Sequence, residues 1–160
     1  MAGLAVALTV ALTAGTLVLA ESFRGKGSHN DRIVGTNHAD RLDGHACDES
    51  IRGRGGGDVL RGGRGDDSVD GGIGNDRVRG QRGDDTLIGG SGNDTEFGGR
   101  GHDRINIAGD GAETGGGGND VIHARDGTTD EISCGTGRDK AIVDRAEDGV
   151  FDCETIVEPR

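Results

Sequence analysis

The most constraining feature of this sequence is a nine-residue repeat that runs unbroken from Lys26 to Asn106. In each line of nine, the sixth place is acidic, and the eighth is aliphatic except in the line that carries Glu96. The sixth places are Asp31, Asp40, Glu49, Asp58, Asp67, Asp76, Asp85, Asp94 and Asp103, and the eighth places are Ile33, Leu42, Ile51, Leu60, Val69, Val78, Leu87, Glu96 and Ile105. A short fixed period of this kind indicates a solenoid, in which each repeat packs only on its neighbours.

Each line divides into a glycine-rich turn of six residues and a strand of three. Glycines at the first, second and fourth places permit positive φ angles and close backbone approach. The turn glycines of the central lines are Gly62, Gly63, Gly65, Gly71, Gly72, Gly74, Gly80, Gly83, Gly89, Gly90, Gly92, Gly98, Gly99 and Gly101. Strand alternation directs the eighth-place side chain inward and its two neighbours outward. Lines stacked about 4.8 Å apart would therefore bury a continuous aliphatic ladder.

We predict an all-β fold, a parallel β-roll (right-handed β-solenoid) over residues 26–142, with two lines per coil and a sheet on each side. Line n then lies directly on line n+2. The segment "IAGDGAET", residues 107–114, interrupts the pattern and is predicted to be a longer turn or a bulged coil, in which Asp110 joins a metal site. Glu96 stands at an inward place and Phe97 follows it, so we expect a bulge that shifts the strand by one residue, buries the ring and releases the acid.

The composition excludes an ordinary core and several classes of function. The 160 residues include 34 glycines, three phenylalanines and no tryptophan or tyrosine, and the formal net charge is −11. Such a charge alone would favour disorder, but the regular period argues against it. Acidic balance disfavours nucleic acid as a partner. The sequence contains no motif of a catalytic nucleophile, a zinc protease or a phosphate-binding loop, so we expect neither an enzyme nor a small-molecule substrate.

The stacked sixth-place carboxylates predict a cation site. Two carboxylates a few ångströms apart repel each other by about 1 kcal/mol in water, and by more when solvent is lost. A hard divalent cation with six to eight oxygen ligands suits this edge, because tight turns also present backbone carbonyls. Calcium fits best, since magnesium demands stricter octahedral geometry and zinc prefers His or Cys, which do not recur in phase here.

The lines from Gly53 to Asn106 resemble the calcium-binding nonapeptide repeat G-G-x-G-x-D-x-U-x of RTX proteins. The resemblance implies several calcium ions held between turns by the sixth-place Asp and turn carbonyls, in a roll that is largely unfolded without metal. Carried over, the paired residues are Asp58 with Asp76, Asp67 with Asp85, Asp76 with Asp94, and Asp85 with Asp103, and Asp120 belongs to the resumed line 115–123. The first three lines depart from the pattern, with His29, His38 and Cys47 in place of the fourth glycine.

The two ends of the chain have other roles. Residues 1–20 are uncharged and end in small residues, which predicts a secretory signal peptide, with a membrane anchor as the alternative, followed by a short linker at 21–25. In an exported protein, Cys134 and Cys153 are expected to form a disulfide, which ties a C-terminal cap at 143–160. This end resembles that of secreted actinobacterial proteins of the same repeat family. Cys47 has no predicted partner, and three roles stay open for it: a free thiol, a disulfide to a second chain, or a small residue in a turn.

The sequence thus predicts a secreted calcium-binding β-roll whose folding is coupled to Ca²⁺. Two alternatives stay open. One is an adhesion or host-interaction protein that uses the roll as a scaffold for an extracellular or cell-surface partner. The other is a disordered acidic calcium buffer, which binds ions without forming strands.

Overall fold

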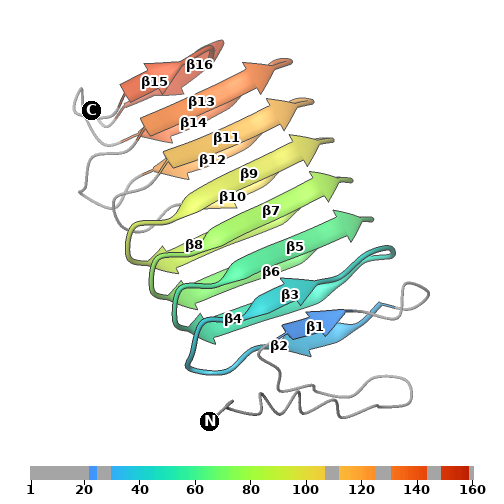
Figure 1. Ribbon diagram of the computed structural model, residues 1–160. Coiled ribbons are helices and arrows are strands. Elements are labelled where there is room, and N and C mark those ends of the chain that lie inside the picture. Colours follow the sequence, from blue (N-terminus) through green and yellow to red (C-terminus); the bar gives the residue numbers. More distant parts are fainter. Residues whose placement is uncertain (1–21, 25–29, 107–111, 125–130, 144–148, 159–160) are drawn as a thin grey trace, which may run out of the picture.

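The computed structural model describes residues 22–24, 30–106, 112–124, 131–143 and 149–158. Within these residues the chain forms two stacked parallel sheets and no helix (Figure 1). The odd sheet contains β1 (Ser22–Arg24), β3 (Arg41–Asp43), β5 (Val59–Arg64), β7 (Arg77–Arg82), β9 (Thr95–Arg100), β11 (Ala112–Gly117), β13 (Glu131–Thr136) and β15 (Gly149–Phe151). The even sheet contains β2 (Arg32–Val34), β4 (Ser50–Gly55), β6 (Ser68–Ile73), β8 (Thr86–Ser91), β10 (Arg104–Asn106), β12 (Val121–Ala124), β14 (Lys140–Val143) and β16 (Thr155–Val157). The predicted β-roll is confirmed.

The pairing confirms that each line stacks on the line two further along the chain. Leu60 of β5 lies opposite Val78 of β7, and Val69 of β6 lies opposite Leu87 of β8. Most strands are longer than the predicted three residues, because the pairing continues into the first half of the next turn, as between Arg64 and Arg82. The turn itself is correspondingly short.

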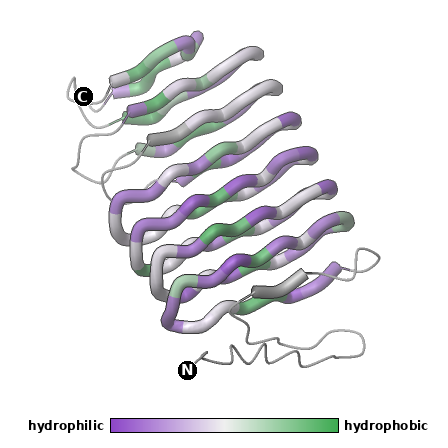
Figure 2. The backbone as a smooth tube through the Cα atoms, in the orientation of Figure 1, coloured by the Kyte–Doolittle hydropathy of each residue, from purple (hydrophilic) through white to green (hydrophobic). Residues whose placement is uncertain are grey.

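The core is the aliphatic ladder between the sheets, and apolar segments recur along the strands in Figure 2. Its buried members include Ile33, Leu42, Ile51, Leu60, Val69, Val78, Leu87, Ile105, Ile122 and Ile132. One side chain per line cannot make a thick core, so the order of the roll depends on every coil supporting the next.

The expected one-residue shift at Glu96 and Phe97 is wrong. Glu96 lies opposite Val78 in unbroken register and is only 1% exposed, whereas Phe97 lies opposite Arg79 on the outer face and is 43% exposed. A bulge here would break the ladder of β9 with both β7 and β11. Backbone pairing on two sides therefore outweighs the preference of one carboxylate for water.

The interruption at 107–114 ends in a regular strand. β11 begins at Ala112, and Glu113 lies opposite Glu96 and Ile132 in the odd sheet. The following turn places Asp120 seventeen residues after Asp103 instead of eighteen. The segment is thus a line one residue short, and Asp110 lies outside the described residues.

Both ends of the chain extend the sheets. β1 falls within the segment expected as a linker and pairs with β3, while β15 and β16 fall within the expected cap and pair with β13 and β14. The predicted signal peptide or anchor at 1–20 lies outside the described residues, which contain no helix long and apolar enough to cross a membrane.

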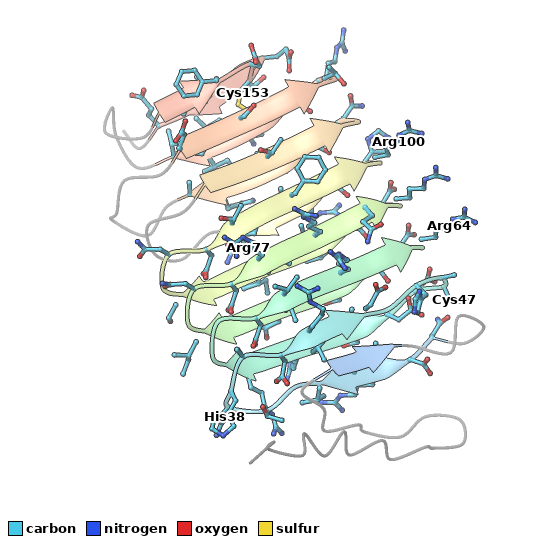
Figure 3. All side chains as sticks on the ribbon, in the orientation of Figure 1. His38, Cys47, Arg64, Arg77, Arg100 and Cys153 are labelled. Atoms are coloured by element: carbon cyan, nitrogen blue, oxygen red, sulfur yellow. A yellow bond between two sulfur atoms is a disulfide. The ribbon has the colours of Figure 1, made fainter. Side chains whose placement is uncertain are left out.

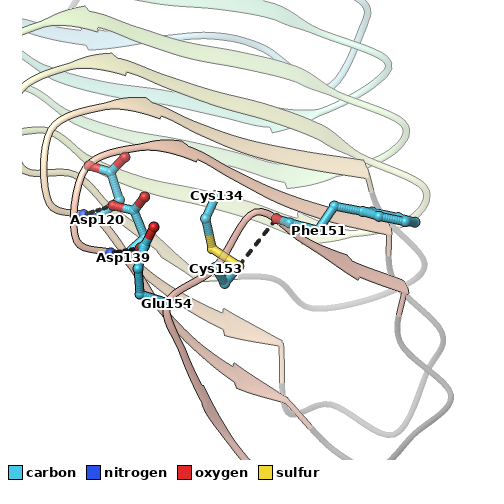
Figure 4. The surroundings of a disulfide bond; sticks show 6 residues. All are labelled: Asp120, Cys134, Asp139, Phe151, Cys153 and Glu154. Atoms are coloured by element: carbon cyan, nitrogen blue, oxygen red, sulfur yellow. Dashed lines mark hydrogen bonds between the residues drawn. A yellow bond between two sulfur atoms is a disulfide. The ribbon is translucent and has the colours of Figure 1, made fainter.

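The predicted disulfide between Cys134 and Cys153 is confirmed, with the two Cα atoms 5.1 Å apart (Figure 4). It joins Cys134, within β13, to Cys153, two residues after the end of β15, and Cys134 is fully buried at the end of the core. Cys47, half-buried in its turn, forms no disulfide within the described residues, and whether it bridges two chains stays a prediction.

Replacing both Cys134 and Cys153 by Ser is expected to lower the free energy of unfolding by about 3 kcal/mol, because the bridge closes a loop of about 20 residues in the unfolded chain. Urea unfolding followed by circular dichroism in saturating calcium measures the loss. Cys47→Ser is the matched control, since Cys47 is free. An equal loss in the control variant would contradict the assignment of this stabilisation to the bridge.

Candidate calcium-binding edges

The sixth-place carboxylates form two columns, one along each edge of the roll. The long acidic column lies in the turns from odd to even strands and consists of Glu49, Asp67, Asp85, Asp103, Asp120, Asp139 and Glu154, and the half-buried Asp31 lies in the turn before Glu49. The short acidic column lies in the described turns from even to odd strands and consists of Asp40, Asp58, Asp76 and Asp94. All are buried except Glu154. Every predicted metal ligand, from Asp58 to Asp120, falls in one of these columns.

One oxygen of each carboxylate ties two coils together. The backbone N–H of Asp67 donates to Asp85 Oδ1 at 2.9 Å, and that of Asp85 donates to Asp103 Oδ1 at 2.9 Å. The short column repeats this contact from Asp58 to Asp76 and from Asp76 to Asp94. The predicted pairs are thus neighbours in the structure.

The long acidic column continues beyond the residues that the sequence singled out. The N–H of Asp120 donates to Asp139 Oδ1 at 2.8 Å, and the N–H of Asp139 donates to Glu154 Oε2 at 2.7 Å (Figure 4). Asp139 was detectable, since it is the sixth residue of the weak line that starts at Cys134. Glu154 follows the disulfide and stands in no regular line, so only the fold reveals it.

The other oxygen of each carboxylate has no hydrogen-bond donor. The buried Oδ2 atoms of Asp58, Asp67, Asp76, Asp85, Asp94, Asp103, Asp120 and Asp139 are all without a partner. Each of them except that of Asp139, whose line begins with Cys134, lies close to the first-place glycine of its own turn. At Gly71, a Cβ atom would come within 2.6 Å of Asp76 Oδ2 and would also meet the carbonyl oxygen of Gly89, from the coil above. A carboxylate oxygen and a carbonyl oxygen therefore face the same space, which only glycine leaves open.

The first turn of the short column differs. Thr36 donates its N–H to Asp40 Oδ2 at 2.6 Å and its hydroxyl to the same oxygen at 3.0 Å. Asp40 Oδ2 therefore already accepts two hydrogen bonds from within the protein. This difference lies in one of the lines whose sequence departs from the repeat.

A second, exposed column lies beside the long one, at the fifth place. The N–H of Asp66 donates to Asp48 Oδ1 at 2.9 Å, and the N–H of Asp84 donates to Asp66 Oδ1 at 2.8 Å. His102 and Asn119 continue the same pattern. Two adjacent acidic columns make this edge more negative than the other, which has Gly57, Asn75 and Asn93 at the fifth place.

Burial raises the pKa of these carboxyls, and neighbouring acids add to the effect. The pKa of Asp85 is raised to about 7, and the pKa values of Asp67, Asp76 and Asp103 to about 6. The pKa of Glu49 is raised to about 8 by burial and by Asp67 and Asp31. The pKa values of Asp58, Asp94 and Asp120 are raised as well, again chiefly by burial. The raised pKa values of Glu49 and Asp85 lie at or above neutral pH, so without a cation these two carboxyls favour the protonated form most strongly.

The calcium-free protein is expected to be more stable at about pH 5 than at about pH 8. The folded-state pKa values of about 6 to 7 at Asp67, Asp76, Asp85 and Asp103 exceed that of Asp in an unfolded chain, about 3.9. The folded state thus binds more protons, and this stabilisation is complete below the unfolded pKa and lost as the pH rises through about 6 to 7. The far-UV circular dichroism of the protein in chelator, recorded across this range, measures the trend, and a β signal that rises with pH would contradict it.

The ligand set suits calcium better than zinc. Nowhere in the described part of the chain do three His, Cys, Asp or Glu side chains gather as a metal cluster. Each coil instead offers buried carboxylate oxygens and nearby carbonyl oxygens, so any bound ion would complete its shell with backbone or water oxygens. Calcium accepts such a mixed oxygen shell, whereas zinc prefers nitrogen and sulfur.

The fold and these columns define a calcium-binding repeat protein of the β-roll class. The family model of the RTX calcium-binding nonapeptide repeat matches in four copies, at residues 27–60, 48–78, 70–105 and 114–128, which together span more than half of the chain. The chain therefore belongs to this family. No curated protein and no solved structure matches it.

Proposed function

We propose that this protein is exported and folds outside the cell when calcium binds between its turns. Family membership supports calcium as the ion, and the observation that carries the coupling to folding is the row of buried Oδ2 atoms without donors. Unpaired buried carboxylates destabilise the folded roll, and a cation that bridges them would remove that cost. The calcium ligands would be Asp58, Asp67, Asp76, Asp85, Asp94, Asp103 and Asp120, to which the columns add Asp139.

The spacing of the columns makes the binding cooperative. Asp85 is linked to both Asp67 and Asp103, so an ion that orders one coil also orders its neighbours. Affinities of about 10⁻⁴ to 10⁻³ M suit an extracellular module. At the much lower calcium level of the cytosol the chain would stay open and suitable for export. No part of this role requires catalysis, and we propose no enzymatic activity.

Titration of the purified protein with calcium, starting in chelator, is expected to give a cooperative gain of β signal in far-UV circular dichroism that magnesium does not reproduce. Asp85→Asn is expected to raise the calcium midpoint at least about threefold, because it removes a charged oxygen from the middle of the long column. Asp70→Asn is the matched control, because Asp70 lies on the outer face of β6, beside Arg52 at 3.7 Å.

The titration separates the alternatives. A flat, coil-like signal with measurable calcium binding would indicate an acidic buffer instead. A full β signal in chelator would contradict coupled folding and leave a scaffold that is held by its aliphatic ladder and disulfide.

A further inference from the structure

The outer face of the odd sheet concentrates positive charge in a protein of net charge −11. Across β5, β7 and β9, Arg61 lies opposite Arg79, and Arg64, Arg82 and Arg100 lie in one register row. Together with Arg77 these residues form what we call the arginine face: Arg61, Arg64, Arg77, Arg79, Arg82 and Arg100. The single acid of these three strands, Glu96, is buried.

The fold does not require this arrangement. Like charges directly opposite each other on neighbouring strands are destabilising. The even sheet avoids the problem, since Arg52 lies opposite Asp70 and pairs with it at 3.7 Å. On the arginine face, Arg61 alone has an acidic partner within ion-pair distance among the described residues, namely Asp43 at 4.0 Å. The other five guanidinium groups are exposed without an ion-pair partner in this part of the chain.

The arginine face is also hollowed. A groove of about 750 Å³ is lined by Arg61, Arg77, Arg79 and Phe97, among others. A second hollow of about 690 Å³, which shares Phe97, is lined by Arg82 and Arg100. Figure 3 shows Arg77 over the odd sheet and Arg64 and Arg100 toward the ends of their strands. Phe97 is 43% exposed, so an apolar ring lies among the guanidinium groups.

We propose that the arginine face binds an acidic polysaccharide that runs along the axis of the roll. Successive coils present guanidinium groups about 4.8 Å apart, a regular row that matches a chain with regularly spaced charges. The planar guanidinium group binds carboxylate and sulfate in bidentate fashion. The ring of Phe97 offers an apolar surface on which a sugar ring packs.

The surroundings favour a narrow ligand over other polyanions. The exposed fifth-place acids Asp48, Asp66 and Asp84 follow one edge of the roll and repel a broad polyanion such as a nucleic acid duplex. A single-stranded nucleic acid stacks successive bases on several aromatic rings, whereas the grooves contain one, Phe97. A membrane surface is flat, whereas Arg61, Arg77 and Arg79 line a groove. Binding of a polysaccharide to the arginine face requires that the roll is folded, but it does not depend on which ion binds in the acidic columns.

Binding of dextran sulfate to the purified protein, at constant saturating calcium, tests this proposal, with neutral dextran as the uncharged control. The protein is expected to bind dextran sulfate and not neutral dextran. The double variant Arg77→Gln, Arg79→Gln is expected to bind at least about tenfold more weakly, which corresponds to about 1.4 kcal/mol. The double variant Arg32→Gln, Arg104→Gln changes the net charge equally on the even sheet and is expected to stay within about twofold of the parent protein.

A further variant tests the role of the ring. Phe97→Ala is expected to weaken binding about threefold without a change in net charge. Circular dichroism in calcium checks that each variant is folded, so that a loss of binding can be assigned to the surface. The same spectra report whether folding depends on calcium. A protein that is folded in chelator would contradict the proposed function, whereas a folded protein that does not bind dextran sulfate would contradict this proposal.

Three results would overturn the proposal. Equal losses in the two double variants would show attraction by net charge alone. Tighter binding to single-stranded poly(dT), lost in the Arg77 and Arg79 variant, would make the face a nucleic-acid site. Binding to phosphatidylserine vesicles that dextran sulfate does not compete would make it a membrane site.

Discussion

Replacing Glu96 by Leu is expected to stabilise the calcium-free roll by about 4 kcal/mol. Glu96 is only 1% exposed and stands in the core column of the odd sheet after Leu60 and Val78. A buried carboxyl loses its hydration, and exchange of buried charged groups for apolar ones of similar volume is often stabilising by about 1 to 4 kcal/mol. The burial of the leucine is part of that gain, and the fully buried place in the core column puts the expected effect at its upper end, about 4 kcal/mol.

A calcium titration followed by far-UV circular dichroism measures this effect, because a variant whose calcium-free roll is more stable folds at a lower calcium concentration. Thr95→Leu is the matched control, because Thr95 precedes Glu96 in β9 and points outward, and it is expected to change stability by less than about 0.5 kcal/mol. Glu96 Oε1 also lies near Asp94 Oδ2 at the turn of Gly89. If Glu96→Leu were instead less stable and bound one calcium ion fewer, Glu96 would be a calcium ligand and its burial would serve the metal.

The fold was predictable because the nine-residue period recurs in every line of the repeat. Leu60, Val69, Val78 and Leu87 recur at one place in nine, and that regularity alone sets the stacking of each line on the line two further along. The sixth-place columns follow from the same period. Asp139 keeps the sixth place of a weak line and was detectable from the sequence, whereas Glu154, in the turn between β15 and β16, stands in no regular line and becomes visible only through its hydrogen bond.

Glu96 shows where reasoning from single residues fails. The preference of one carboxylate for water is a local quantity, whereas register is shared by every strand in the sheet. β9 is held on one side by β7 and on the other by β11, and its two turns are tied by Asp94 and Asp103. A shift of one residue would disturb all of these contacts. The sequence did not predict the arginine face for a related reason. Its rows form only when lines eighteen residues apart lie side by side.

Replacing Gly56 by Ala is expected to destabilise the calcium-loaded roll by about 4 kcal/mol. Gly56 has φ of +112°, outside the left-handed region near +57° that an L residue tolerates. A Cβ atom there would strike the backbone of the coil below, at 2.6 Å from Ala39 N and 2.7 Å from His38 O. The strained dihedral costs about 1 to 3 kcal/mol and the overpacking a similar amount.

Gly55 is the matched control, because it precedes Gly56 in the same turn. It has no positive φ, and the nearest atom to an added Cβ is Asn37 Cα at 3.6 Å. Gly55→Ala is therefore expected to change stability by less than about 1 kcal/mol, and a stabilising sign is consistent with reduced entropy of the unfolded chain. Urea unfolding in saturating calcium compares the two variants. An equal loss of stability in the two variants would contradict this argument. It would mean that the contact of Gly56 with the backbone of the coil below does not limit how closely the coils approach.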